Sequence, residues 1–176
     1  MITLTRITTP DSPAYRKIEE LLTATFPRDE YRDLAEQRAN VAGRENFHLL
    51  QACCNGKFIG FVSYWQLEGF CYIEHLAILP EVRGKGYGKF ILEQLQKCLH
   101  KIVLEVEEPV DETTTRRIAF YRRAGFTLCN IPYTQPPYHK GGNALPMLLM
   151  FHGWEPDSNN YEKAKNSIYK NIYNYK

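Results

Sequence analysis

Residues 72–92 constrain the fold of this chain more than any other stretch. The first half is a short apolar run of β-branched and aromatic residues that ends at Pro80, which predicts a largely buried strand. An apolar pattern of helical spacing follows, and before it three glycines stand at alternate positions: Gly84, Gly86 and Gly88. The chain therefore contains a strand, a glycine-rich turn and a helix in direct succession.

A turn of this kind is suited to binding an anion. Glycine adopts positive φ and has no Cβ, so consecutive backbone amides can point at one ligand. The helix that begins near Tyr87 adds unpaired N–H groups and the positive end of its dipole. Arg83, Lys85 and Lys89 add positive charge around the turn. The segment therefore predicts a site for a phosphate or pyrophosphate group.

Two familiar phosphate-binding motifs can be compared with this turn by their spacing. A P-loop needs a glycine five residues before its Gly-Lys pair and a Ser or Thr after it, whereas Arg83 and Phe90 occupy those positions here. The dinucleotide fingerprint Gly-x-Gly-x-x-Gly needs its third glycine one residue later than Gly88. The spacing excludes the P-loop and disfavours a nucleotide-binding oxidoreductase.

The pattern that does fit is Arg-x-x-Gly-x-Gly over residues 83–88, after a strand that ends in Leu-Ala-Ile. In this pattern the chain resembles the GNAT superfamily of acyl-CoA-dependent N-acetyltransferases. The resemblance implies that coenzyme A lies along the end of the strand and against the start of the helix. The cofactor-binding residues that it implies in this segment are Leu76, Ala77, Ile78, Arg83, Gly84, Lys85, Gly86, Tyr87, Gly88 and Lys89.

A second motif lies in residues 116–126, where Ile118, Tyr121 and Ala124 share one helical face. Its pattern Ala-Phe-Tyr-x-x-x-Gly-Phe resembles the other GNAT signature, in which the tyrosine lies near the sulfur of coenzyme A. Seven residues before that tyrosine many family members carry an Asn that approaches the cofactor. This chain has Thr114 there, which is able to cap the helix. The resemblance thus adds Thr114 and Tyr121 to the cofactor-binding residues.

The chemistry of acetyl transfer requires three groups. An amine must lose a proton before it attacks a thioester, the developing oxyanion needs N–H donors, and the departing thiolate is best protonated. Tyr72, Glu74 and Leu76 alternate onto one face of the central strand, and Glu74 is the carboxylate nearest the place where family members keep a base. A carboxylate flanked by Ile73 and Leu76 is expected to have a raised pKa. We therefore predict Glu74 as the base, the Leu76 N–H as the oxyanion donor and Tyr121 as the acid, with a salt-bridged structural role as the alternative for Glu74.

The rest of the chain predicts an α/β (α+β) fold with a mixed, mostly antiparallel sheet of about seven strands and helices on both faces. Asn55-Gly56 between two β-rich runs is a strong hairpin signal. The expected strands are residues 2–7, 47–54, 58–65, 70–79, 102–106, 126–129 and 146–151, and the expected helices are residues 14–26, 30–41, 87–99 and 116–124.

Three connections are candidates for the surroundings of the acceptor. The resemblance makes residues 26–31, at the break between the first two helices, candidate substrate-lining residues, with a solvated turn as the alternative. Residues 107–115 predict a loop whose acidic side chains either attract a cationic acceptor or face solvent. Residues 132–142 predict either an ordered connection or a lid-like one, with two tyrosines.

Length and composition define the class of protein. The chain of 176 residues predicts one acetyltransferase-like domain over residues 1–152 and a polar tail over residues 153–176 that forms a loose amphipathic helix. A net charge of +2 without a basic face predicts no nucleic-acid partner, and the lack of a signal core or membrane-length apolar run predicts no membrane contact and a cytoplasmic location. Five cysteines without a Cys-x-x-Cys pair and five scattered histidines predict no metal site. The sequence is compatible with a monomer or a homodimer.

The two motifs together predict an N-acetyltransferase that moves an acetyl group from acetyl-CoA to a primary amine by direct attack in a ternary complex. The acceptor is a small molecule or a peptide, and nothing in the sequence specifies which. The competing interpretation is an acyl-CoA-binding sensor or assembly module of the same fold without turnover. The presence of both Glu74 and Tyr121 favours the enzyme.

Overall fold

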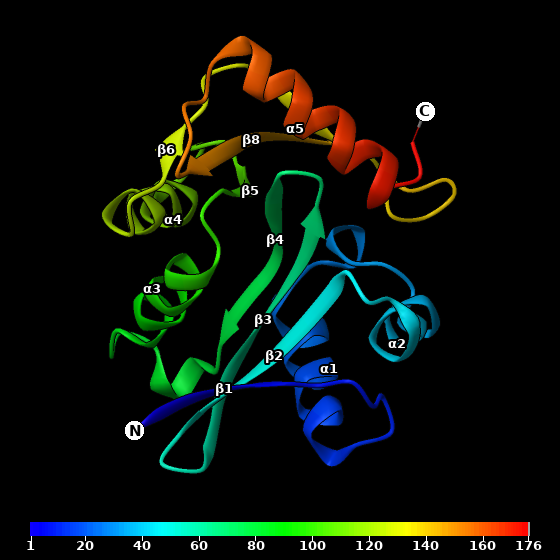
Figure 1. The fold of residues 1–176 in the computed structure, drawn as a ribbon, viewed down its shortest axis with the longest axis vertical. Coiled ribbons are helices and arrows are strands. Elements are labelled where there is room, and N and C mark those ends of the chain that lie inside the picture. The colour runs from blue at the N-terminus through cyan, green and yellow to red at the C-terminus, as the bar shows by residue number, and fades with distance from the viewer. Residues whose placement is uncertain (176) are drawn as a thin grey trace.

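The computed structural model describes residues 1–175, which form eight strands and five α-helices (Figure 1). The strands are β1 (Ile2–Arg6), β2 (Phe47–Cys54), β3 (Lys57–Leu67), β4 (Phe70–Ile78), β5 (Ile102–Glu107), β6 (Thr127–Leu128), β7 (Tyr133–Gln135) and β8 (Leu145–His152). The helices are α1 (Pro13–Thr25), α2 (Leu34–Gly43), α3 (Tyr87–Cys98), α4 (Glu112–Arg123) and α5 (Ser158–Asn171), with two short 3₁₀ helices, η1 (Arg28–Glu30) and η2 (Pro80–Val82).

All eight strands belong to one sheet in the order β1-β2-β3-β4-β5-β8-β6, and β7 also pairs with β8. The pair of β4 and β5 is parallel, while the other pairs are antiparallel. This confirms the predicted mixed, mostly antiparallel sheet. The eighth strand, β7, was missed because its three residues lie inside residues 132–142, which predicted only a connection.

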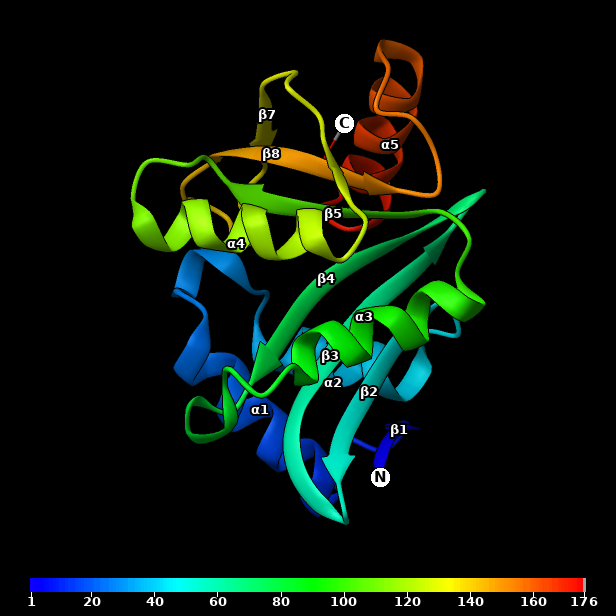
Figure 2. The ribbon, with the colours of Figure 1, turned by 90° about the vertical axis from the view of Figure 1, so that its left-hand side faces the viewer.

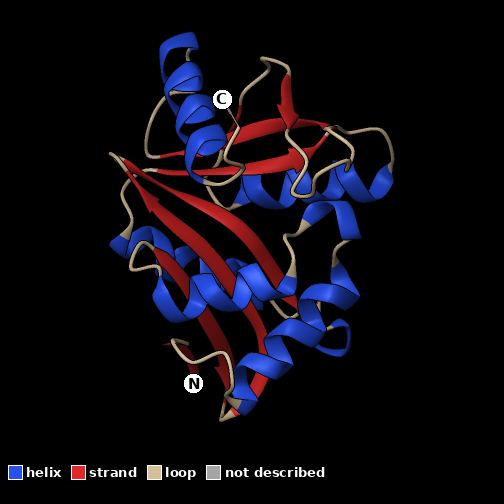
Figure 3. Ribbon diagram, turned by 90° about the vertical axis from the view of Figure 1, so that its right-hand side faces the viewer, coloured by secondary structure: helices blue, strands red, loops and turns tan. Residues whose placement is uncertain are grey.

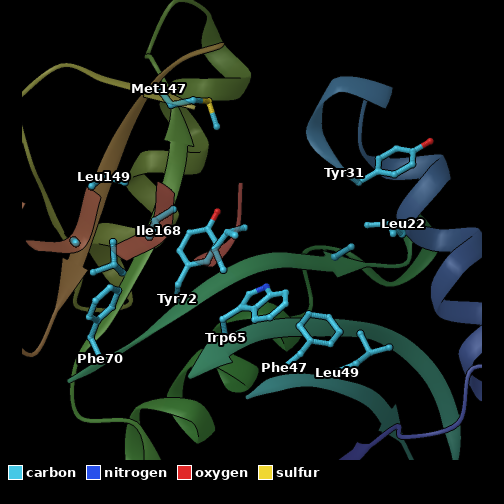
Figure 4. Packing of buried hydrophobic residues seen from close by; sticks show 14 of the residues in the cluster. Leu22, Tyr31, Phe47, Leu49, Trp65, Phe70, Tyr72, Met147, Leu149 and Ile168 are labelled. Atoms are coloured by element: carbon cyan, nitrogen blue, oxygen red, sulfur yellow. The ribbon is translucent and has the colours of Figure 1, made fainter. Parts of the chain in front are cut away.

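Helices cover both faces of the sheet, as predicted (Figures 1 and 3). Side chains of α3 and α4 pack with one buried cluster that includes Ile91, Leu92 and Ile118. Side chains of α1, α2 and α5 pack with a second cluster on the opposite face (Figure 4), which includes Tyr72 and Ile168. Each strand face is therefore apolar, which explains why the central strands are near-continuous apolar runs.

The parallel strands β4 and β5 begin side by side and then diverge (Figure 2). They pair only from Cys71 with Ile102 to Ile73 with Leu104, although both strands continue beyond these residues. A β-bulge lies at the same level, because the register of β3 and β4 shifts between Ser63 and Tyr64 and leaves Glu74 as the extra residue. The bulge and the divergence open the sheet at its centre.

Two helix starts differ from the predicted ones. Helix α4 begins at Glu112, inside the stretch expected to be a loop, because Asp111 caps it through a hydrogen bond from the Thr114 backbone N–H of 2.8 Å. Helix α2 begins at Leu34 rather than at residue 30, because η1 and an extended Tyr31 come first. The Asp111 cap sets the start of α4, whereas no side-chain cap marks the start of α2.

The predicted amphipathic helix near the C-terminus is confirmed as α5. Its apolar residues Tyr161, Ala164 and Ile168 are at most 4% exposed and join the same buried cluster as α1. No helix among residues 1–175 combines the length and apolar character needed to cross a membrane.

Candidate active site

The glycine-rich turn between β4 and α3 has the conformation that the sequence predicted. Gly84 and Gly86 have φ of +77° and +80°, in the left-handed region, and a Cβ built on either would meet no atom within 4 Å. Glycine is thus needed at both positions for backbone conformation and for approach from outside. Gly88 has a different role, because a Cβ there would lie 3.1 Å from the Phe120 ring and separate α3 from α4.

The N-terminus of α3 faces this open turn. Gly86 is its N-cap and has no side chain to satisfy the first amides, and the first helical bond runs from Phe90 N–H to the Gly86 carbonyl at 3.0 Å. Arg83 Nε donates to the Ile78 carbonyl at 3.0 Å and ties the turn to the end of β4. Free amides, a helix dipole and the exposed Lys85 make the turn a suitable cradle for a pyrophosphate.

A cavity of about 290 Å³ lies where β4 and β5 diverge. It brings together the predicted Glu74, Leu76 and Tyr121, and its wall also contains Phe26, Pro27 and Glu30 from the segment between α1 and α2. The other lining residues come from α1, β4, β5, α4, β7, β8 and the loop after β7: Thr25, Ile73, His75, Leu104, Glu105, Val106, Glu107, Arg117, Gln135, Tyr138 and Met147.

Glu74 is buried in the cavity wall and is held by an ion pair. The two terminal guanidinium nitrogens of Arg32, Nη1 and Nη2, contact its carboxylate, with Nη1 3.0 Å from Oε2, and the Arg32 side chain is only 2% exposed. Trp65 Nε1 and Tyr138 Oη donate to the same carboxylate at 3.0 and 2.9 Å. Burial alone would raise the pKa of Glu74, but Arg32 and the other donors outweigh it and lower that pKa. The expectation of a raised pKa was wrong, because sequence neighbours do not reveal a counter-charge from a distant loop.

Glu105, one strand further along the sheet, has the opposite environment. Tyr133 Oη donates to its Oε1 at 2.5 Å, and Tyr173 Oη lies 3.0 and 2.8 Å from its two oxygens. No basic side chain among residues 1–175 forms an ion pair with it. Burial raises the pKa of Glu105 to about 7, although hydrogen bonds from Tyr133 and Tyr173 oppose the shift and the Glu74 charge adds to it.

Tyr121 projects from α4 into the cavity, and Phe120 and Phe126 hold its ring edge-on at centroid distances of 5.1 and 5.7 Å. Burial raises the pKa of its hydroxyl to about 12, so the group stays protonated at neutral pH. Among residues 1–175 this hydroxyl has no hydrogen-bond partner. It is therefore available to a ligand as a donor.

The backbone of β4 supplies a further donor. The Leu79 N–H donates to the Ile59 carbonyl on β3 at 2.9 Å. Successive amides of a strand point to opposite sides, so every second amide points the same way. The amides of Leu76 and Ile78 therefore point away from β3 and toward the gap in front of β5. The predicted oxyanion donor, Leu76, lies in the cavity wall beside Glu74.

Comparisons with known proteins agree with this geometry. The family model described as the acetyltransferase (GNAT) family matches residues 13–126, which is more than half of the chain. This chain belongs to the GNAT acetyltransferase family. A solved GNAT-family protein from Bacteroides thetaiotaomicron, provisionally named an acetyltransferase, is 43% identical, covers 99% of each chain and superposes with a TM-score of 0.94.

Two other relatives are more distant. YjbC of Bacillus subtilis strain 168, also provisionally named an acetyltransferase, is 27% identical over 164 residues, which cover 89% of this chain and 81% of YjbC. A GNAT acetyltransferase from Elizabethkingia anophelis, solved with acetyl-CoA bound, is 19% identical, covers 86% of this chain and 97% of its own, and superposes with a TM-score of 0.57. As a member of this family the protein is an acetyl-CoA-dependent N-acyltransferase, and acetyl-CoA is its acetyl donor.

Thr114, one of the predicted cofactor-binding residues, uses its side chain within the start of α4. Thr114 is 6% exposed, and its hydroxyl accepts from the Asp111 backbone N–H at 3.1 Å and donates to the Asp111 side chain at 2.9 Å. It is the third residue of α4 in a reciprocal capping box, so its side chain stabilises the helix start. It does not line the cavity.

The sequence reasoning missed Glu105, Tyr138, Tyr173 and Arg32. Glu105 carries a signal, because it is the charged residue inside an otherwise apolar strand of the GNAT core. The other three come from loops and from the C-terminal end; only the segment of Tyr138 was singled out, as a connection with two tyrosines, and no pattern marks Arg32 or Tyr173. His75 is buried beside Glu74, but burial lowers its pKa and keeps it neutral, and its Nε2 lies 2.8 Å from the Glu30 carbonyl oxygen. In the part of the chain that the structure describes, no three His, Cys, Asp or Glu residues gather as metal ligands would.

Proposed function

We propose that this enzyme acetylates the primary amine of a small cationic molecule, with Glu105 as the general base and Tyr121 as the general acid. The observation that supports it best is the cavity itself, which contains Glu105, Tyr121 and the Leu76 amide at the opening between β4 and β5. Acetyl-CoA supplies an activated thioester when it is bound. Its pyrophosphate would be held by the backbone amides of residues 84–89, helped by Lys85.

The residues of the chain then act in turn on protons and charge. The Glu105 carboxylate takes a proton from the acceptor ammonium, which frees the nitrogen lone pair for attack on the carbonyl carbon. The Leu76 N–H stabilises the negative charge that develops on the carbonyl oxygen. The attack forms the C–N bond, and the Tyr121 hydroxyl then gives a proton to the departing sulfur as the C–S bond breaks. The nitrogen loses its second proton as the intermediate collapses to the amide. That proton restores the Tyr121 phenol, and Glu105 releases its own proton to solvent. In sum, an ammonium ion and a thioester become an amide, a thiol and one released proton.

The base is assigned to Glu105 in place of Glu74. A base that works near neutrality needs a pKa near the working pH and must be free of a permanent counter-charge. The pKa of Glu105 is raised to about 7, whereas that of Glu74 is lowered and its carboxylate is held by Arg32. Glu74 instead anchors the loop that forms the acceptor side of the cavity.

The acceptor is proposed to be small because the cavity is small and closed on one side. Its volume of about 290 Å³ lies at the lower end for ligand pockets, which run from about 300 to 1,000 Å³. The loop after β7 contacts the segment around η1, since His139 contacts Arg28, and Asn143 Nδ2 donates to Asp29 at 3.3 Å. These two joined segments would keep the surface of a folded protein from reaching Glu105.

The acceptor is proposed to be cationic because carboxylates outnumber basic groups in the wall. Arg32 neutralises Glu74 and Arg117 pairs with Glu107, which leaves Glu105 and Glu30 without an ion-pair partner among residues 1–175. Burial raises the pKa of Glu30, and the charge of Glu107 raises it further. A bound ammonium would offset both effects.

The test is steady-state acetylation of a panel of small mono- and diamines and of short peptides. We expect small amines to be preferred, and Glu105→Gln to lose most of the turnover while calorimetry with acetyl-CoA shows an unchanged affinity. Glu108→Gln, which removes a carboxylate outside the cavity, is the matched control and should behave as the parent. Parent-like rates for Glu105→Gln over the whole acidic range would place the base elsewhere, and a preference for peptides would contradict the small acceptor.

A further inference from the structure

A residue near the C-terminal end of the chain contacts the proposed catalytic base, Glu105, which lines the active-site cavity. Tyr173 lies two residues beyond the end of α5 and 68 positions from Glu105 in sequence, yet its hydroxyl lies 3.0 Å from Oε1 and 2.8 Å from Oε2 of that carboxylate. This end of the chain is outside the matched family region, residues 13–126. It contributes a side chain to the site that the shared motifs do not supply.

Helix α5 fixes where Tyr173 lies. Ile168 and Ile172 are 0% and 4% exposed in the cluster on this face of the sheet. Tyr161 Oη donates to the Pro132 carbonyl at 2.7 Å, which ties the helix to the segment before β7. The Tyr173 ring packs against Tyr138 with centroids 4.8 Å apart and an interplanar angle of 57°. The position of Tyr173 is therefore fixed by the docked helix before it and by the Tyr138 ring beside it.

We propose that Tyr173 is a positioning residue for the catalytic base: its hydroxyl, presented by the docked C-terminal helix, orients the Glu105 carboxylate toward the acceptor and stabilises its ionised form. This inference rests on the proposed function, because Glu105 acts as the base there. It makes α5 a part of the active site and not only a cover for the sheet.

Several groups from other elements face the same carboxylate. The donors are Tyr133 on β7 and Tyr72 on β4, and Tyr72 Oη lies 3.4 Å from Tyr173 Oη. The charge of Glu74 disfavours ionisation of Glu105, as does burial. The Glu105 charge also contributes to the raised pKa of two further tyrosines, Tyr138 in the loop after β7 and Tyr169 on α5, so both stay neutral where Glu105 titrates.

The direction of the effect follows from these contacts. A hydroxyl that donates to a carboxylate favours its ionised form, so loss of the Tyr173 hydroxyl raises the proton affinity of Glu105. The base then stays protonated to higher pH, and the acidic limb of kcat/KM moves upward by about one pH unit, as expected for one hydrogen bond to a charged group. Tyr173→Phe keeps the ring, so water gains no new access that would offset the effect.

The experiment compares pH profiles of kcat/KM for the parent, Tyr173→Phe and Tyr169→Phe. Tyr169 lies on the same helix, but its hydroxyl donates to the Thr134 carbonyl, so this control should leave the limb in place. We expect an upward shift for Tyr173→Phe alone, with the KM for acetyl-CoA unchanged. An unmoved limb in Tyr173→Phe, or an equal shift in both variants, overturns the inference.

A second readout does not depend on turnover. In protein labelled at the glutamate carboxyl carbon, the ¹³C resonance absent from Glu105→Gln identifies Glu105, and its titration can be followed in the parent and in Tyr173→Phe. A higher titration midpoint in the variant supports the inference, and the same midpoint contradicts it. If the parent acetylates no amine of the panel, the proposed function fails, while this titration still decides whether Tyr173 stabilises the ionised Glu105.

Discussion

Arg32 and Glu74 form a two-pronged ion pair in the wall of the active-site cavity, with Arg32 Nη1 3.0 Å from Glu74 Oε2 and both side chains at most 2% exposed. The guanidinium also donates to Gln37 at 2.9 Å and lies over the Trp65 ring at 5.3 Å. This pair fastens the loop between α1 and α2 to the bulge of β4. It thereby fixes one wall of the acceptor site.

Arg32→Met should destabilise the fold strongly, because it leaves the buried Glu74 carboxylate without a counter-charge. Removal of one partner of a buried ion pair costs about 3–5 kcal/mol in the free energy of unfolding. Urea denaturation at pH 7.5 would measure this loss. Arg38→Met is the control, since Arg38 pairs with Glu19 at the surface and its removal should change the free energy of unfolding little.

The same pair predicts a pH dependence. Because the pKa of Glu74 is lower in the folded protein than in the unfolded chain, the pair stabilises the fold above the unfolded pKa, and this stability is lost as the pH falls through the folded pKa. The stability deficit of Arg32→Met should therefore shrink in acid. An Arg32→Met deficit no larger than that of Arg38→Met would contradict a charged Glu74.

Glu105→Gln should stabilise the protein at alkaline pH and not in acid. The pKa of Glu105 is raised from 4.5 to about 7, so between these values the folded state binds more protons than the unfolded state and stability falls as the pH rises. The destabilisation at pH 8 amounts to about 3 kcal/mol, from 1.36 kcal/mol per pKa unit. Gln keeps the shape and accepts from Tyr133 and Tyr173 without a charge. Thermal unfolding of both proteins at pH 5 and pH 8 would show whether the difference grows with pH, and a constant difference would argue against the raised pKa.

These contacts also explain how far the sequence could predict the site. The glycine turn and the Tyr121 motif are local patterns, in which a few neighbouring residues determine the conformation, and both were found from sequence. Arg32 meets Glu74 across 42 positions, and Tyr173 meets Glu105 across 68. Such contacts depend on how the loops and α5 pack, which no short pattern encodes. The choice between Glu74 and Glu105 as base therefore needed the structure.

Gly86→Ala should weaken binding of acetyl-CoA beyond its effect on the fold. Alanine at a φ of +80° costs about 1–2 kcal/mol of stability, and its methyl group would occupy the open side of the turn where the pyrophosphate is expected. Gly56→Ala is a matched control, because Gly56 has a φ of +77° and open surroundings in the β2–β3 hairpin. Calorimetry should give an affinity at least about tenfold lower for Gly86→Ala and unchanged for Gly56→Ala. Equal affinities in the two variants would move the pyrophosphate away from this turn.

Tyr121→Phe should impair chemistry far more than binding. Burial raises the pKa of the Tyr121 hydroxyl to about 12, so the group is protonated at neutral pH and is able to donate to a departing thiolate, whose conjugate thiol has a pKa of about 8.5. Phenylalanine keeps the ring and its contacts with Phe120 and Phe126, so the acetyl-CoA affinity should stay within a few-fold.

The expected loss for Tyr121→Phe is in kcat, by the ~10²–10⁴ typical of a positioned acid. Tyr64→Phe removes a hydroxyl from β3 outside the cavity and should retain the parent rate. Single-turnover kinetics is the appropriate measurement, because it reports the chemical step even where product release limits kcat. A parent-like single-turnover rate in Tyr121→Phe would leave the tyrosine as a packing residue, and the proton on the departing sulfur would then come from solvent.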